Sequence, residues 1–335
     1  MEDLLNITNL KTHFFTKRGV VPAIDGISIS IPKRSIIGIV GESGCGKSMT
    51  AMSIMQLVQK PGKIVQGTIK LNGEDMLKYS KEQMLDVRGN KISMIFQEPM
   101  TSLNPVYTVG KQVAEAITIH HHNIRKHEAK QKVIDIFRAV GIPEPEKRFN
   151  SYPHQLSGGL RQRVMIGMAM VCNPQLMIAD EPTTALDVTI EAQILLLMKK
   201  LQKDRDTSIL LITHNLGVVA EVCDYVYVMY AGKVMEQANT FELFKNTNHP
   251  YTDGLMRSIP KITAEKQRLY NIEGMVPNLM KLPKGCRFCP RCAKAIPKCF
   301  EQEPPLYKVA IKVENAGDHY VRCFLYENSE VKENE

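Results

Sequence analysis

The segment GESGCGKS, which runs from Gly41 to Ser48, has the residue types that bind the phosphates of a nucleotide. Its glycines let the backbone turn successive N–H groups toward phosphate oxygens, and the helix expected after Gly46 adds its positive end. Lys47 would reach the β- and γ-phosphates, and the Ser48 hydroxyl would bind Mg²⁺. We therefore expect a P-loop with these ATP-contacting residues: Gly41, Glu42, Ser43, Gly44, Cys45, Gly46, Lys47, Ser48 and Met49.

A pair of carboxylates follows the apolar run LMIAD, which is predicted to be a buried strand. Asp180 ends that strand and would hold Mg²⁺ through a water molecule. Glu181 comes next and points differently, so it would polarise the attacking water as a general base. A DE pair at a strand end can also be a simple helix cap, but the following Pro182 and TTALD favour the catalytic interpretation.

Two further motifs, LSGGLRQR from Leu156 and LITHN from Leu211, complete an ordered set with the P-loop and the DE pair. This order resembles the ATPase subunits of ABC transporters over roughly the first 250 residues. The resemblance implies that Gln97, in SMIFQEP, contacts Mg²⁺ and the lytic water. It also implies that His214 contacts the γ-phosphate and that Ala185, Leu186 and Asp187 form a loop at a dimer interface.

The same resemblance gives Ser157, Gly158 and Gly159 the role of the family signature. There it faces the ATP held by a partner subunit's P-loop, at a helix N-terminus that binds phosphate. Two ATP molecules would then be buried between two head-to-tail ATPase subunits, and hydrolysis would let them part. Leu160 stands where many members of the family have glutamine. The adenine ring needs an aromatic platform, for which we favour Phe15 over Phe14 because alternation exposes only one of them.

Three stretches narrow the branch of the family: FQEPMTSLNP from Phe96, YPHQLSGGLRQRVMIGMAM from Tyr152, and HPYTDGLMRSIP from His249. They resemble the D-type ATPase of oligopeptide and dipeptide importers. The resemblance implies a second, different ATPase, two membrane permeases and an extracytoplasmic peptide-binding protein as partners. Import of nickel or another small solute is the alternative, and a soluble ABC ATPase of DNA repair or translation is a more distant one. Intact Gln97, Glu181 and His214 argue against a non-hydrolysing regulatory subunit.

Five of the eight cysteines lie between Cys286 and Cys323, in a proline-rich stretch that cannot bury much apolar surface alone. Such a segment is usually stabilised by a cross-link, and in a cytosolic chain a bound metal is a better candidate than a disulfide. Zinc and an iron–sulfur cluster both use closely spaced thiolates. The GCxFxxRC pattern of peptide-importer ATPases matches this segment and implies a [4Fe-4S] cluster, with zinc as the alternative. Its ligands would be Cys286, Cys292, Cys299 and Cys323, with Cys289 either an additional thiol or a replacement for one of the four.

These residues require an α/β fold that places them at the ends of strands. Residues 1–33 alternate apolar and polar side chains, which predicts an antiparallel β region. Strands at SIIGIV, QLMIAD, SILLITH and DYVYVMYAGKV alternate with helices, which predicts a mainly parallel sheet. A helical subdomain is expected at about 99–165. We expect an ATPase domain over 1–245 and a small irregular, cysteine-rich C-terminal domain over 246–335.

Composition sets the remaining limits. The 335 residues suggest one large or two modest domains, with 44% hydrophobic residues for a core. The net charge of +8 comes from evenly spread Lys and Arg, so we interpret it as a mildly basic surface and expect no nucleic-acid partner. No apolar run approaches the ~18 residues of a membrane span, and the start lacks the features of a signal peptide. We expect a peripheral protein at the cytoplasmic face of the membrane, held there by its permeases.

Overall fold

The computed structural model describes residues 2–97, 102–184, 186–259, 270–314 and 317–328. The chain forms two compact units, each assembled from separate stretches of sequence. The first unit consists of Met1–Leu5, Ile31–Ile36 and Leu71–Ile212. The second unit consists of Asn6–Ser30, Ile37–Lys70 and Thr213–Glu335. The domain boundary expected near residue 246 stays a prediction.

In the second unit, long strands near the N-terminus form the expected antiparallel sheet. The order of its strands is β2 (Gly19–Pro32), β1 (Asp3–Thr16) and β4 (Gly62–Leu71). The two-residue strand β5 (Glu74–Asp75) belongs to the first unit. Leu10 and Thr12, two positions apart on β1, are completely buried, while the intervening Lys11 and the following His13 are only partly buried. This alternation is what a sheet with one buried face requires.

The second unit also holds one part of the main sheet, and this part is mixed. Strand β3 (Ile36–Val40) pairs in parallel with β9 (Tyr225–Tyr230), which pairs antiparallel with β10 (Lys233–Asn239). Every residue of β3 is buried, as expected for a strand inside a covered sheet. The helices of this unit are α1 (Lys47–Ile54), α9 (Leu216–Val222), α10 (Thr240–Lys245), α11 (Pro250–Arg257) and α12 (Pro297–Glu301).

The C-terminal stretch is more regular than the sequence indicates. Strand β12 (His319–Val321) pairs antiparallel with β10, and β11 (Tyr307–Val309) pairs antiparallel with β12. Each of these strands has three residues, which is too short for a periodic pattern to reveal. The expected small, irregular C-terminal segment therefore also contributes two short strands to the sheet of the second unit.

The first unit contains the parallel strands β6 (Ile92–Ile95), β7 (Leu176–Asp180) and β8 (Ser208–Thr213), with β7 in the middle. Its helices are α2 (Lys81–Val87), α4 (Val109–His120), α5 (Lys126–Ala139), α6 (Pro145–Arg148), α7 (Gly158–Met170) and α8 (Val188–Asp204). Short 3₁₀ turns occur in both units: η1 (Met76–Lys78), η2 (Pro153–Gln155), η3 (Cys289–Arg291) and η4 (Phe324–Tyr326).

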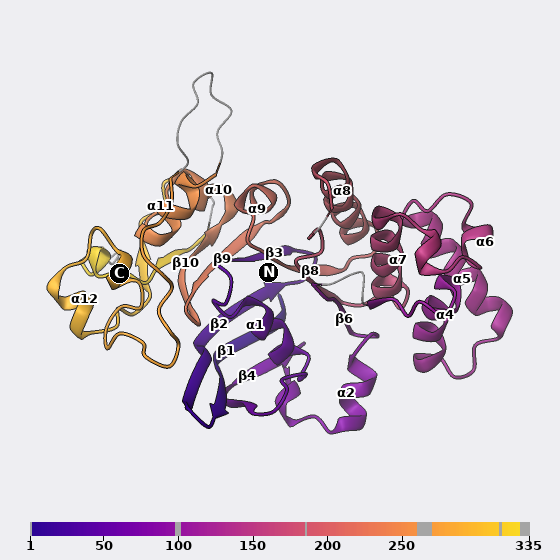
Figure 1. Ribbon diagram of the computed structural model, residues 1–335, viewed down its shortest axis with the longest axis horizontal. Coiled ribbons are helices and arrows are strands. Elements are labelled where there is room, and N and C mark those ends of the chain that lie inside the picture. Colours follow the sequence, from indigo (N-terminus) through magenta and orange to yellow (C-terminus); the bar gives the residue numbers. More distant parts are fainter. Residues whose placement is uncertain (1, 98–101, 185, 260–269, 315–316, 329–335) are drawn as a thin grey trace, which may run out of the picture. The chain divides into compact units, whose positions relative to one another are not determined.

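Helices α4, α5 and α7 of the first unit pack against one another, and Figure 1 shows them as one helical group together with α6. Helix α4 buries Val109, Val113 and Ile117, and α5 buries Val133 and Phe137 in the same spacing. Apolar residues four positions apart lie on one face of a helix, so these faces form the core of the group. The group occupies the part of the sequence expected to be a helical insertion. Among the described helices, none combines the length and apolar character that crossing a bilayer requires.

Candidate nucleotide site and cysteine segment

The P-loop connects β3 with α1 in the second unit, which is the strand–loop–helix context that the motif requires. Gly41 has a φ of 154°, and a Cβ there would lie 2.1 Å from the Met229 carbonyl oxygen. Gly46 has a φ of 108°, and a Cβ would lie 2.6 Å from the Ala23 carbonyl oxygen. Ser43 and Gly44 are exposed, whereas Glu42, Ser48 and Met49 are half-buried. Only glycine fits the close backbone approaches at both ends of the loop.

Lys47 is buried and its ammonium group lies inside the loop. The Nζ atom donates hydrogen bonds to the carbonyl oxygens of Gly41 at 2.7 Å and of Glu42 at 3.1 Å. The neighbouring Cys45 is completely buried, and burial raises the pKa of its thiol. A protonated, buried thiol is unreactive, so Cys45 acts in the loop through its small size and its backbone rather than through thiol chemistry.

In the first unit, the structure brings together two of the predicted catalytic residues, which are 84 positions apart in sequence. The Gln97 amide nitrogen donates to Glu181 Oε2 at 3.2 Å, and the Thr184 hydroxyl donates to the same oxygen at 3.1 Å. Glu181 has a φ of 48°, a left-handed conformation that is unfavourable for a residue with a side chain. Asp180 ends β7 and is buried. Such strain is typically found at functional sites, where the surroundings hold the residue in place.

The predicted signature residues lie at the start of α7, again in the first unit. The Ser157 hydroxyl accepts a hydrogen bond from the Leu160 N–H at 3.4 Å and caps the helix. Ser157 and Gly158 are exposed, and Gly159 is half-buried. Asp187 caps α8 in the same way, by accepting a hydrogen bond from the Ile190 N–H at 3.0 Å. Ala185 lies outside the described residues.

The remaining predicted nucleotide residues belong to the second unit. His214 follows β8, is exposed, and precedes Asn215, whose side chain caps α9. Phe15 is 47% exposed on β1, whereas the Phe14 ring lies so close to Gly62 that a Cβ there would be 2.8 Å from it. Phe15 therefore has the exposure that an adenine platform needs, and Phe14 is a packing residue.

The C-terminal cysteines lie in the second unit, and the structure forms no disulfide among the chain's cysteines, all of which are described. Cys286, Cys289, Cys299 and Cys323 are buried, and Cys292 is partly buried. Burial, reinforced by neighbouring thiols, raises the pKa of Cys286 to about 12 and that of Cys323 to about 11. Within the described ranges, no group of three or more His, Cys, Asp or Glu residues is arranged to hold a metal ion.

Sequence reasoning missed two residues that contact the P-loop from the C-terminal region. Arg291 binds the Glu42 carboxylate with N–O distances of 2.6 and 3.0 Å, and the Tyr251 hydroxyl accepts a hydrogen bond from the Glu42 N–H at 2.8 Å. They are separated from Glu42 by 249 and 209 positions. Arg291 is part of the GCxFxxRC pattern, but no local pattern in the sequence indicated that it pairs with Glu42.

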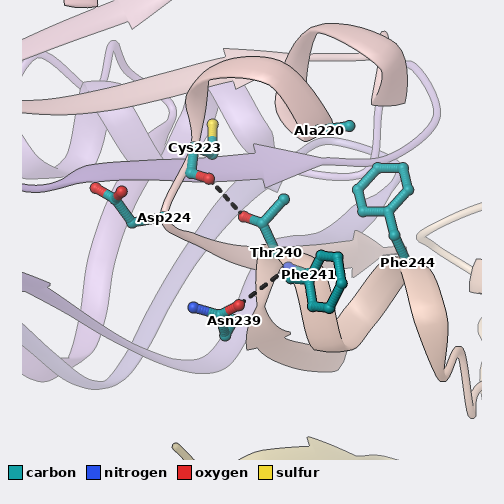
Figure 2. A pocket seen from close by; sticks show the side chains of 7 residues that line it. All are labelled: Ala220, Cys223, Asp224, Asn239, Thr240, Phe241 and Phe244. Carbon is teal, nitrogen blue, oxygen red and sulfur yellow. Dashed lines mark hydrogen bonds between the residues drawn. The ribbon is translucent and has the colours of Figure 1, made fainter. Parts of the chain in front are cut away.

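A pocket of about 370 Å³ lies between α9 and α10 in the second unit (Figure 2). In its wall, the Thr240 hydroxyl donates a hydrogen bond to the Cys223 carbonyl oxygen at 2.7 Å. The Phe241 N–H donates to Asn239 Oδ1 at 3.0 Å. The pocket contains neither P-loop residues nor cysteines of the C-terminal segment, so it is separate from the candidate nucleotide site.

Comparison with known proteins decides the family. Residues 24–184 match the family model described as ABC transporter, and residues 235–299 match that of the oligopeptide/dipeptide transporter C-terminal region. The chain is 52% identical to the oligopeptide transport ATP-binding protein AppD of Bacillus subtilis (strain 168) over 328 residues, which cover 98% of each chain. The chain belongs to the ATP-binding proteins of oligopeptide and dipeptide ABC transporters. The resemblance seen in its motifs is thereby confirmed.

Further relatives agree with this family of ABC transporter ATPases. The dipeptide transport ATP-binding protein DppD of Escherichia coli (strain K12) is 45% identical over 307 residues, 92% of this chain and 94% of DppD. Among solved structures, cbiO1 from Clostridium perfringens, part of the ABC transporter complex cbiONQ, has a TM-score of 0.64 at 26% identity. The match covers 73% of this chain and 92% of cbiO1. The expected α/β ABC ATPase fold, with an antiparallel N-terminal sheet, is confirmed.

Proposed function

We propose that this ABC transporter ATPase powers the import of oligopeptides or dipeptides. The observation that carries the proposal is the match of residues 235–299 to the C-terminal region of oligopeptide and dipeptide transporters. The chain would work with a second, different ATPase, two permeases and an extracytoplasmic peptide-binding protein. It would be held at the cytoplasmic face of the membrane by those permeases. Because an ATPase subunit does not touch the cargo, the peptide assignment rests on family membership.

The geometry within each unit supports specific roles in ATP hydrolysis. We assign Lys47 and the other P-loop residues to the phosphates, and Ser48, Gln97 and Asp180 to Mg²⁺. Glu181 is the general base that takes a proton from the attacking water. Its carboxylate oxygen Oε2 already accepts hydrogen bonds from Gln97 and Thr184. Those donors orient the carboxylate before the water arrives, which lowers the cost of reaching the reactive geometry.

The residues outside the P-loop and the DE pair would complete the site across a dimer. The exposed start of α7, with Ser157, Gly158 and Gly159, would bind the γ-phosphate of ATP held by the partner ATPase. Asp187 would lie at the same interface, His214 would contact the γ-phosphate, and Phe15 would support the adenine ring. The exposure of Ser157, Asp187, His214 and Phe15 supports these assignments.

We further propose that the cysteine segment binds a [4Fe-4S] cluster through Cys286, Cys292, Cys299 and Cys323. What supports this proposal is the resemblance of the segment to the GCxFxxRC pattern, together with the burial of Cys286, Cys299 and Cys323. In the described residues the thiols are not arranged as a metal-holding group, so cluster binding would have to gather them. The cationic iron–sulfur core would favour the thiolates and so lower the raised pKa values of Cys286 and Cys323. When bound, the cluster would act as a structural staple for residues 246–335, which we propose as a domain beside the ATPase domain of 1–245 with its helical subdomain at about 99–165.

The test is transport by the assembled importer in liposomes that contain the permeases and both ATPases, with the binding protein and a labelled peptide added. Glu181→Gln is expected to reduce peptide-stimulated ATP hydrolysis by about 100-fold or more while ATP still binds, because the base alone is lost. Glu115→Gln, which alters an exposed carboxylate on α4, is the control and should leave hydrolysis unchanged. Wild-type hydrolysis in Glu181→Gln would refute the catalytic assignment. Stimulation of ATP hydrolysis by nickel instead of peptide would refute the assignment of peptides as the cargo.

A further inference from the structure

Glu42 of the P-loop uses its amide, its carbonyl and its carboxylate in separate interactions within the second unit. Its N–H donates to the Tyr251 hydroxyl at 2.8 Å, and its carboxylate binds Arg291 with both guanidinium NH₂ groups. Its carbonyl oxygen accepts a hydrogen bond from Lys47 Nζ at 3.1 Å. Glu42 therefore connects the C-terminal region directly to the lysine that is expected to bind phosphate.

Arg291 is held rigidly enough to position Glu42. Its side chain is only 5% exposed, and it donates further hydrogen bonds to the carbonyl oxygens of Glu273 at 3.0 Å and Ile272 at 3.1 Å. The guanidinium lies 5.8 Å from the centre of the Tyr230 ring. The hydrogen bond to Glu42 raises the pKa of Arg291 above its ordinary range. A buried guanidinium needs its carboxylate partner, so the pair constrains both residues.

Tyr251 fixes the same residue from a second direction. Its ring on α11 is completely buried and packs against Tyr230 and Phe288, with ring centres 4.7 and 5.3 Å away. The position of its hydroxyl oxygen is therefore set by the packing of the ring rather than by rotation about exposed bonds. The Glu42 N–H is oriented toward that fixed acceptor.

We propose that Arg291 and Tyr251 are positioning residues of the nucleotide site, which act on the P-loop and on Lys47 through Glu42. Without these contacts the first half of the loop would sample more conformations. ATP binding would then have to order the loop, and this entropic cost would weaken the affinity. The C-terminal region thus sets the affinity for MgATP. This inference rests on the proposed ATPase function.

The experiment measures MgATP affinity with a fluorescent ATP analogue, and kcat at saturating ATP, for Tyr251→Phe, Glu42→Gln and Arg291→Lys. Tyr251→Phe keeps the buried ring and removes only the acceptor, so about 3- to 10-fold weaker binding is expected. Glu42→Gln and Arg291→Lys should each weaken binding by about tenfold, since they remove the paired charge or its bidentate geometry. For Tyr251→Phe and Arg291→Lys, which lie outside the P-loop, we expect kcat at saturation to change by less than about twofold, because the general base is untouched.

A double-mutant cycle separates positioning from general destabilisation. Glu42→Gln combined with Arg291→Lys should weaken binding no more than the more severe single variant, because both remove one interaction. Arg257→Lys is the matched control, since Arg257 is an exposed arginine that pairs with Asp253 on the same helix as Tyr251. It should bind MgATP as the wild type does.

Two results would overturn the inference: unchanged affinity in Tyr251→Phe and Glu42→Gln, or additive losses in the double variant. If Arg291→Lys does not fold, Tyr251→Phe and Glu42→Gln carry the test, and unchanged MgATP affinity in both would overturn the inference. If the wild-type chain binds and hydrolyses ATP and the variants bind MgATP with unchanged affinity, only the positioning role is contradicted. A wild-type assembly without ATP hydrolysis contradicts the proposed function itself.

Discussion

At the scale of single residues, the Glu181 carboxylate brings together residues that are far apart in the sequence. Gln97 and Thr184 donate to one of its oxygens, and the backbone at Glu181 is left-handed. Gln97 and Glu181 were both predicted from short motifs, because the residues that define each motif are the ones that carry out the chemistry. Thr184, Arg291 and Tyr251 were not predicted as site residues, because their importance comes from contacts that only the fold creates.

Thr184→Val tests whether the hydroxyl that donates to Glu181 assists the general base. Loss of one orienting hydrogen bond should lower kcat by about 5- to 10-fold and leave MgATP affinity unchanged. Thr118→Val, which removes an exposed hydroxyl bonded to the Glu115 carbonyl oxygen on α4, is the matched control. Steady-state ATP hydrolysis and equilibrium ATP binding are the two measurements. A variant with an unchanged kcat would show that Gln97 alone orients the carboxylate.

Lys47→Ala addresses binding rather than catalysis. The buried ammonium now bonded to the Gly41 and Glu42 carbonyl oxygens is the group proposed to meet the phosphates. Its removal should weaken MgATP binding by about 100-fold, as expected for loss of charge-assisted hydrogen bonds. Equilibrium binding of a fluorescent ATP analogue measures the effect. Retained affinity would count against the assignment of this loop to phosphate.

At the scale of elements, local patterns predicted those segments whose partners are close in sequence or whose burial is periodic. Helices α4 and α5 show the spacing of a buried face, and β3 and β7 are short continuous apolar runs. Strands β11 and β12 were not predicted, because their stability comes from β10. His319 on β12 lies between Glu236 on β10 and Glu242 on α10, with nitrogen–oxygen distances of 2.9 and 3.4 Å. No local pattern contains such a contact.

The buried Glu242 carboxylate should make the stability of the second unit depend on pH. Burial acts to raise its pKa, but hydrogen bonds from the Lys312 and Val313 N–H groups, Asn246 and His319 outweigh it and lower the pKa below the ordinary value of 4.5. A lowered folded-state pKa stabilises the protein above about pH 4.5, and this stabilisation is lost as the pH falls through the lower folded value.

Glu242→Gln should therefore reduce the free energy of unfolding by about 1–3 kcal/mol at pH 7. The difference from the wild type should shrink below pH 4, where the wild-type carboxylate is protonated too. Urea unfolding at pH 7, 5, 4 and 3 measures both effects. Glu301→Gln, on the exposed side of α12, should follow the wild type at every pH. Parallel stability curves for Glu242→Gln and the wild type would contradict the prediction.

At the scale of the whole molecule, the order of the motifs and the family resemblance that it carries predicted the ATPase fold, but the contacts between the P-loop and the C-terminal segment came only from the structure. The second unit combines residues 6–30 and 37–70 with residues 213–335. The P-loop and the cysteine segment therefore belong to one compact body, although more than two hundred positions separate Glu42 from Arg291.

Metal analysis of anaerobically purified protein tests the proposed cluster. Iron and sulfide near four atoms each per chain are expected for a [4Fe-4S] cluster, with absorption that disappears in Cys292→Ala. Cys172→Ala, which alters a cysteine of the first unit, is the control and should retain the iron. Zinc in place of iron would establish the alternative metal. Absence of both would refute the metal staple.

The late position of β12 has a consequence for synthesis of the protein in the cell. Strand β10 is complete once residue 239 has left the ribosome, but its antiparallel neighbour β12 begins at His319. During that interval β10 presents an unpaired edge and Glu236 lacks its histidine. Unpaired edges invite pairing with other chains. Messages truncated before this strand should thus yield products that chaperones retain or proteases remove, so only full-length chains would reach the membrane complex.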